Sequence, residues 1–186
     1  MNEIPYISSI CHKHTKREGD GNCGFRAIVA CLDYSEDNWC QIRLDLQNKL
    51  LAHPVEYAQI FYYDLSTIHH SLNFNGSRFT PKDRWLVMPV TSFLIANKYS
   101  VIVIFLSKDS PSTCFPLWLG PQDISTHRVV VIALVRGDHY VKVDLHGAYP
   151  MLTILPLWHH HGLLDGNRDG RKILQYGCTR ELGVVR

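Results

Sequence analysis

The chain of 186 residues lacks the features that mark several classes of protein. Its longest strongly apolar stretch, residues 101–106, is far shorter than the roughly 20 residues of a membrane-spanning helix. Residues 1–10 lack the apolar core of a secretion signal. No run of five or six like charges occurs, and 19 basic against 17 acidic residues leave a formal net charge of +2. These absences predict an intracellular protein, cytoplasmic or nuclear, that binds neither membrane nor nucleic acid.

The cysteines lack the paired C-x-x-C spacing of a structural zinc site and the density of a secreted disulfide scaffold. Free thiols in a reducing compartment are therefore expected. Cys31 and Cys40 have apolar neighbours and are expected to be buried spacers. Histidines 12, 14 and 159–161 fit no standard metal spacing, so neither metal nor cofactor is expected.

Hydrophobic periodicity predicts several helices. Turn residues at 19–22 lead into a helical pattern over 23–32, which places Cys23 at a helix N-terminus. A second helix is expected from a cap at Ser35 to Pro54, and a short helix with an Asn-Gly loop within 55–79. Thr80 and Pro81 resemble the start of one kinked helix or two short ones that run to residue 98.

Two short β-branched runs, 101–106 and 129–135, are typical of strands buried on both faces. Turn residues at 136–138 precede an alternating segment, 139–145, which is expected to pair as a hairpin. His139 would begin that last strand. No internal repeat divides the chain, and its length fits one domain.

Cys23 has the surroundings that a cysteine nucleophile needs. Unpaired N–H groups and the positive dipole end of a helix favour the thiolate and can bind a developing oxyanion. Gly21 and Gly24 leave room for close approach of a substrate. A general base is also required, and His139 is well placed at a turn-to-strand junction. On position alone, however, such a histidine is more often structural or simply exposed.

Residues 19–27, Gly-Asp-Gly-Asn-Cys-Gly-Phe-Arg-Ala, resemble the nucleophile motif of the ovarian-tumour (OTU) cysteine proteases. A second match lies at 129–141, where a strand and a short turn precede histidine and an aromatic residue. The stretch from Trp85 to Trp158 is similar to OTU domains of transposon-associated and fungal proteins. The resemblance implies an α/β (α+β) fold of the papain-type OTU kind, with a small central β-sheet flanked by helices. It also implies a catalytic domain over 15–160, between an N-terminal extension, 1–14, and a C-terminal tail or peripheral segment, 161–186.

The resemblance further implies a deubiquitinase. Such an enzyme hydrolyses the isopeptide or peptide bond after the C-terminal glycine of ubiquitin, of polyubiquitin or of a ubiquitin-like modifier, here as a monomer without a cofactor. Cys23 would be the nucleophile and His139 the general base. Asp20 is included among the catalytic residues, chiefly because it shapes the loop. The oxyanion hole would be formed by the backbone N–H groups of Asp20, Gly21, Asn22 and Cys23.

One departure from the family pattern concerns the residue that orients the histidine. Many members have Asn or Asp two positions after it, where this chain has Val141. Asp144 should point to the opposite face of the strand from His139. Upstream candidates for the residue that orients His139 are Asn2, Glu3 and Glu18. The third residue of a catalytic triad therefore stays open, and a Cys-His dyad is an alternative.

Two other functions remain as alternatives: a catalytically silent ubiquitin-binding module and a cysteine acyltransferase. Segment 55–98 is expected to help dock ubiquitin. Trp85 and Trp158 are expected to pack in the core or at its edge rather than contact substrate.

Overall fold

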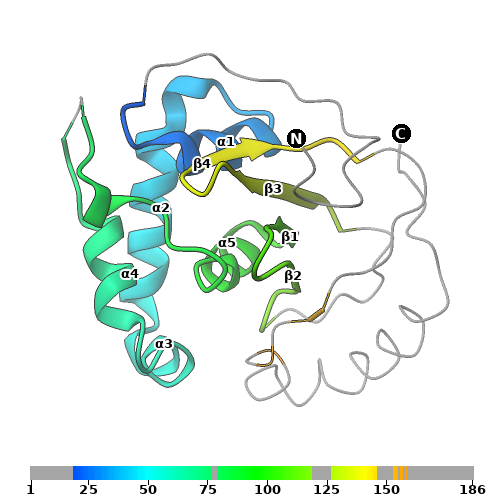
Figure 1. The fold of residues 1–186 in the computed structure, drawn as a ribbon. Coiled ribbons are helices and arrows are strands. Elements are labelled where there is room, and N and C mark those ends of the chain that lie inside the picture. Colours follow the sequence, from blue (N-terminus) through cyan, green and yellow to red (C-terminus); the bar gives the residue numbers. More distant parts are fainter. Residues whose placement is uncertain are drawn as a thin grey trace, which may run out of the picture.

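The structure is a computed structural model that describes residues 19–76, 79–118 and 127–145, together with residues 153, 154, 156 and 158. Figure 1 shows the arrangement of its elements. The helices are α1 (Cys23–Cys31), α2 (Trp39–Ala52), α3 (Pro54–Ile60), α4 (Leu65–Leu72) and α5 (Ser92–Tyr99), with short 3-10 helices η2 (Glu36–Asn38) and η3 (Lys82–Arg84). The strands are β1 (Ile102–Leu106), β2 (Ser112–Cys114), β3 (Val129–Val135) and β4 (His139–Lys142).

The strands form one mixed sheet in the order β2-β1-β3-β4. The two central strands, β1 and β3, are parallel, and Phe105 lies opposite Ile132. The outer strands run antiparallel to their neighbours, and β4 pairs with β3 so that His139 lies opposite Val135. Buried β-branched residues in β1 and β3 suit a strand that is covered on both faces. The sheet therefore fixes His139 at the beginning of an edge strand.

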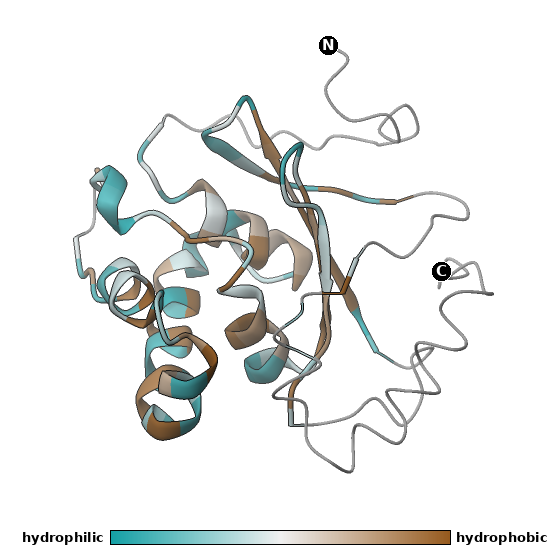
Figure 2. Cartoon of the chain, turned by 60° about the horizontal axis from the view of Figure 1, so that its bottom comes forward, coloured by the Kyte–Doolittle hydropathy of each residue, from teal (hydrophilic) through white to brown (hydrophobic). Residues whose placement is uncertain are grey.

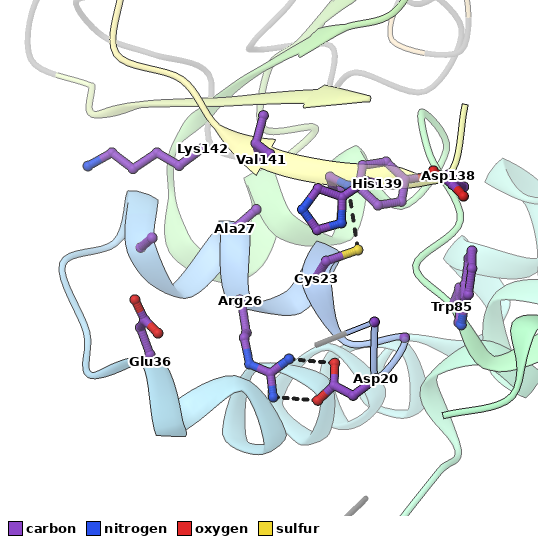
Figure 3. A pocket seen from close by; sticks show the side chains of 14 residues that line it. Asp20, Cys23, Arg26, Ala27, Glu36, Trp85, Asp138, His139, Val141 and Lys142 are labelled. Atoms are coloured by element: carbon purple, nitrogen blue, oxygen red, sulfur yellow. Dashed lines mark hydrogen bonds and ion pairs between the residues drawn. The ribbon is translucent and has the colours of Figure 1, made fainter. Parts of the chain in front are cut away.

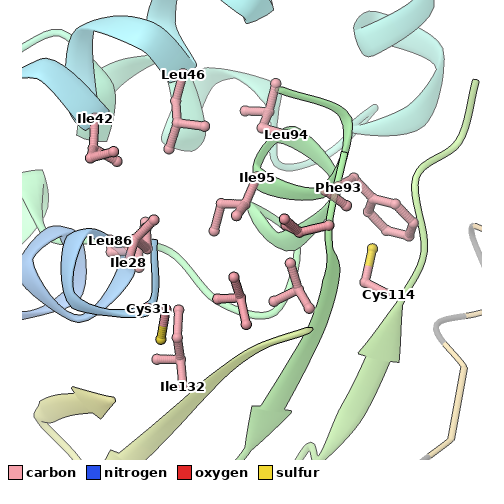
Figure 4. Packing of buried hydrophobic residues seen from close by; sticks show 14 of the residues in the cluster. Ile28, Cys31, Ile42, Leu46, Leu86, Phe93, Leu94, Ile95, Cys114 and Ile132 are labelled. Carbon is pink, nitrogen blue, oxygen red and sulfur yellow. The ribbon is translucent and has the colours of Figure 1, made fainter. Parts of the chain in front are cut away.

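The described helices lie on one side of this sheet (Figure 2). α1 contacts β3 and β4, whereas α5 contacts β1 and β2. The main apolar core lies between the helices and the sheet, where Ile28, Leu46, Leu94 and Ile132 pack together (Figure 4). Burying each such side chain stabilises the fold by about 1.5–3 kcal/mol. The packing of α1 against β4 brings the two predicted catalytic segments together.

The predicted fold class is confirmed, and the helix over 23–32 and the strands 101–106 and 129–135 are each found within a residue of their expected bounds. Segment 55–79 holds two helices, α3 and α4, rather than one. β2 was not predicted at all. The domain limits fall in segments 1–18 and 159–186, which lie outside the described residues.

Two predictions are wrong, and a third holds in part. Of the one kinked helix or two short ones expected over 80–98, the structure has the 3-10 helix η3 and, from Ser92, α5. Residues 85–91 between them are not helical, because Pro89 lacks a donor N–H and disfavours helical geometry before it. Thr80 does not cap a helix with its side chain; its hydroxyl donates to Asn22 Oδ1 over 2.8 Å. Cys40 is exposed on α2, although Cys31 is buried as expected.

Candidate active site

The loop before Cys23 makes a turn that only glycine accommodates easily. Gly21 has φ +78°, in the left-handed region. A Cβ atom at this position would lie 2.4 Å from the carbonyl oxygen of Thr80 and 2.4 Å from Nε1 of Trp85. The Thr80 N–H also donates to the carbonyl oxygen of Asp20 over 2.7 Å. The segment of residues 80–85 thus packs against the loop and holds it in place.

The Asp20 carboxylate closes this loop onto α1. Nη1 and Nη2 of Arg26 donate to its two oxygens, each over 2.6 Å, and the Asn22 N–H donates to Oδ1 over 3.0 Å. Burial raises the pKa of Asp20, but the hydrogen bonds from Arg26 and Asn22 outweigh it and leave the pKa below its ordinary value. Figure 3 shows the carboxylate directed at Arg26 and away from His139. Asp20 therefore shapes the loop as an ionised carboxylate.

Asn22, the N-cap of α1, is fully buried and does not cap the helix with its side chain. Its Oδ1 instead accepts hydrogen bonds from Nη2 of Arg43 over 3.0 Å and from the hydroxyl of Thr80. The residue immediately before Cys23 is thereby fixed to α2 and to the segment before η3.

The nucleophile and base candidates lie in one pocket, between α1 and β4. Figure 3 shows the His139 ring beside the Cys23 thiol. Tyr140, the next residue on β4, donates its N–H to Cys23 Sγ over 3.5 Å, and its hydroxyl donates to the carbonyl oxygen of Leu86 over 3.2 Å. The first bond holds the start of β4 against the N-terminus of α1, and the second joins Tyr140 to the segment between η3 and α5.

Burial raises the pKa of the Cys23 thiol, and the negative charge of Asp20 raises it further. The N–H groups of Tyr140 and Gly24 act in the opposite direction but do not outweigh burial. The thiol therefore needs a nearby base to accept its proton. The imidazole of His139 lies in the same pocket and has the chemistry for that transfer.

The pocket has a volume of about 430 Å³ and runs along α1 beyond Cys23. It is lined by Gly19, Asp20, Gly21, Cys23, Arg26, Ala27, Ala30, Glu36, Trp85, Asp138, His139, Tyr140, Val141 and Lys142. Trp85 is half-buried at the edge of the pocket and donates Nε1–H to the Thr80 carbonyl over 3.0 Å. Trp158 is buried against Phe115, as expected.

None of the predicted candidates for a third catalytic member that the structure describes is directed at the histidine. Val141 packs with Ile104 and Val131 in a small apolar cluster. Asp144 pairs with Lys142 over 3.4 Å. Asn2, Glu3 and Glu18 lie outside the described residues.

Two arginines near the site, Arg26 and Arg43, were not assigned roles from the sequence. Arg26 falls inside the motif around Cys23, so its spacing from Asp20 was an available signal. Nothing in the local sequence marks Arg43, because its partners come from distant segments.

Within residues 19–158 as far as they are described, no group of three or more His, Cys, Asp or Glu side chains could hold a metal ion. The histidines at 12, 14 and 159–161 lie outside that part. No described helix is long and apolar enough to cross a membrane.

No protein-family model matches the sequence, and no curated protein matches it either. Among solved structures, the chain resembles the crystal structure of the viral OTU domain protease from Dera Ghazi Khan virus. The two chains are 16% identical, and the match covers 74% of this chain and 82% of the viral one with a TM-score of 0.50. Identity this low bears on the fold alone. The chain therefore has an OTU-like protease fold.

Proposed function

We propose that this protein is a cysteine deubiquitinase, which hydrolyses the bond after the C-terminal glycine of ubiquitin or of a ubiquitin-like modifier. The observation that carries the proposal is the meeting of Cys23 at the N-terminus of α1 with His139 at the start of β4, inside one pocket. The resemblance of the surrounding motif and the OTU-like fold point to ubiquitin as the substrate.

The reaction begins when His139 accepts the proton of the Cys23 thiol. The thiolate adds to the carbonyl carbon of the terminal glycine, and the carbonyl electron pair moves onto oxygen. His139 then donates its proton to the departing lysine amine, which leaves a thioester on Cys23. A water molecule, deprotonated by His139, hydrolyses the thioester and restores the free thiol.

The oxyanion requires backbone donors near Cys23. We place them in the segment from Asp20 to Cys23, where one of the four N–H groups, that of Asn22, already donates to the Asp20 carboxylate. The remaining donors include Gly21 and Cys23, and the first N–H groups of α1 have no partner within the helix. Asp20 contributes by holding the loop in this shape.

The globular part of ubiquitin needs a separate docking surface. α3 and the turn after it expose Val55, Tyr62 and Tyr63, and they belong to the segment expected to bind ubiquitin. Alanine substitution of Tyr62 and Tyr63 should weaken ubiquitin binding several-fold and leave turnover of a bound substrate unchanged. Unchanged affinity would remove this surface from the proposal.

Turnover of ubiquitin with a fluorogenic amine on its C-terminus tests the function. Wild type should release the fluorophore, and Cys23→Ala and His139→Ala should each reduce kcat by at least about 1000-fold, as loss of a nucleophile or its base does. Cys40→Ala is the matched control, because Cys40 is an exposed thiol that does not line the pocket. Equal turnover by wild type and Cys23→Ala would refute the proposal.

A catalytically silent ubiquitin-binding module is the second candidate. It is favoured by the apolar packing of Val141, where many relatives orient the histidine, and by the burial that raises the pKa of Cys23. Binding of ubiquitin without any Cys23-dependent turnover would select this candidate.

A further inference from the structure

Arg43 is a charged side chain in the interior of the helical layer. It lies on α2, is 2% exposed, and its guanidinium carbon lies 4.0 Å from the centroid of the Phe25 ring. Nη1 donates to the carbonyl oxygens of Ser71 and, over 3.0 Å, of Arg84. Nη2 donates to Asn22 Oδ1 over 3.0 Å. One side chain thus joins the ends of α4 and η3 to the residue before the nucleophile.

These described hydrogen-bond partners of Arg43 are all uncharged oxygens. Burial lowers the pKa of Arg43 to about 10, so the side chain is still protonated at neutral pH. Burying a charge without a counter-charge is unfavourable, and hydrogen bonds and the face of an aromatic ring offset this only in part. An apolar residue would avoid this cost but would leave the oxygens of Ser71, Arg84 and Asn22 without this donor. What the arginine adds is therefore the junction between these three segments.

The contact with Asn22 suggests what the arginine does. Asn22 is fully buried, and its Nδ2 donates to the Asp20 carbonyl oxygen over 3.4 Å. Its Oδ1 is shared by Arg43 and the Thr80 hydroxyl. The asparagine side chain is therefore held from several directions. The carbonyl carbon of Asn22 is bonded to the nitrogen of Cys23. Fixing Asn22 by these hydrogen bonds therefore also fixes the direction of the Cys23 N–H.

We propose that Arg43 is a positioning residue for the oxyanion hole, acting through Asn22. It holds the 21–23 backbone so that the N–H groups point to the place where negative charge develops when Cys23 attacks a carbonyl. The inference rests on the proposed function for its substrate, and it adds a role that lies outside the catalytic pair. A donor that is aimed beforehand costs no reorganisation during the reaction.

A residue needed only for folding would behave differently from a positioning residue. Alkylation of Cys23 by iodoacetamide displaces iodide and forms no oxyanion, whereas attack on a carbonyl does. Loss of Arg43 should therefore slow the attack of Cys23 on a carbonyl and leave its alkylation by iodoacetamide unchanged. Burial raises the pKa of Cys40 and the charge of Arg43 lowers it, so the alkylation rate of Cys23 is referenced to an added small-molecule thiol in the same sample and not to Cys40.

The experiment compares wild type with Arg43→Met, Arg43→Lys, Asn22→Ala and the Arg43→Met/Asn22→Ala pair. In Arg43→Met, kcat on the fluorogenic ubiquitin amide should fall about 30-fold to 300-fold with KM within twofold, somewhat less than the roughly 100-fold to 1000-fold loss of an oxyanion donor itself, because the donors remain but are less well aimed. Alkylation of Cys23, followed by peptide mass, should change less than twofold. Arg43→Lys should recover part of kcat, because its ammonium can still reach one of the three oxygens.

The double variant tests the route through Asn22. If Arg43 acts through that side chain, the double variant should be no slower than the slower single variant. Losses that multiply would overturn the proposal, as would equal slowing of turnover and alkylation. If Arg43→Met does not fold, Asn22→Ala and Arg43→Lys carry the same comparison.

Hydrogen-deuterium exchange gives a readout that needs no ubiquitin. Arg43→Met should speed exchange at residues 20–24 at least fivefold and leave β1 and β3 unchanged. If wild type does not act on ubiquitin but this local change occurs, the proposed function fails and the positioning role stands. Unchanged exchange at 20–24 would overturn the positioning role whether or not the protein is active.

Discussion

Replacement of Arg26 by methionine should affect both stability and the nucleophile. Arg26 donates to both oxygens of Asp20 over 2.6 Å, and the two side chains are only 11% and 26% exposed. Methionine retains the unbranched stem, and with it much of the packing near Trp39, over whose ring the guanidinium lies. The change therefore removes the charge and the two hydrogen bonds with little loss of volume.

The expected cost follows from this geometry. A hydrogen bond to a charged group contributes about 1.5–3 kcal/mol, so two such bonds would contribute about 3 kcal/mol at the lower end, and the partial exposure of this pair reduces that sum. We expect a loss of about 2 kcal/mol in the free energy of unfolding, or about 30-fold in the folding equilibrium. The carboxylate of Asp20 already raises the pKa of Cys23, and without Arg26 its charge is unopposed.

Two assays check these effects. Urea unfolding gives the stability, and the pH dependence of iodoacetamide alkylation at Cys23 gives the midpoint of thiol ionisation. The midpoint of Arg26→Met should lie at higher pH than that of wild type. In the Arg26→Met/Asp20→Asn pair it should return to lower pH, since the carboxylate is gone. A midpoint in Arg26→Met equal to or below that of wild type would refute the electrostatic reasoning.

Other predictions concern single groups. Gly21→Ala adds about 1–2 kcal/mol of left-handed strain and a collision with the Thr80 carbonyl; a thermal midpoint equal to that of wild type would contradict it. Burial raises the pKa of Cys31 to about 12, so at pH 7.5 iodoacetamide should label Cys40 and leave Cys31 unlabelled, as peptide mass would reveal. The pKa of Asp20 is lowered in the fold; its stabilising contribution is complete above its unfolded pKa of about 3.9 and is lost as pH falls through the folded value. Acid unfolding below about pH 4 should thus be steeper for wild type than for Asp20→Asn, and identical slopes would speak against the Arg26 pairing.

Local patterns predicted the parts of the fold that depend on nearby residues. Helix α1 and strands β1 and β3 follow from periodicity and β-branched composition, and the turn before His139 follows from its glycine. The short strand β2 carries no such pattern, because its pairing with β1 depends on tertiary contact. Pro89 marked an interruption, but its position alone did not show that the helix would begin only at Ser92.

The candidate site divides in the same way. Cys23 and His139 were predicted from motifs, and the structure brings them into one pocket. The supports of the loop were not predicted, since Thr80 and Arg43 reach Asn22 from positions 58 and 21 residues away. A pattern within one segment cannot predict these hydrogen bonds, because they form only when distant segments pack against the loop in the folded protein.

In the proposed reaction Cys23, assisted by His139, attacks the C-terminal carbonyl of ubiquitin. Incubation with ubiquitin that carries an electrophilic C-terminal group, followed by intact mass, measures this attack itself. Wild type should gain one ubiquitin, His139→Ala should react far more slowly, and Cys23→Ala should not react. A folded wild-type protein that gains no mass, or a Cys23→Ala variant that gains the same adduct, would contradict the claim.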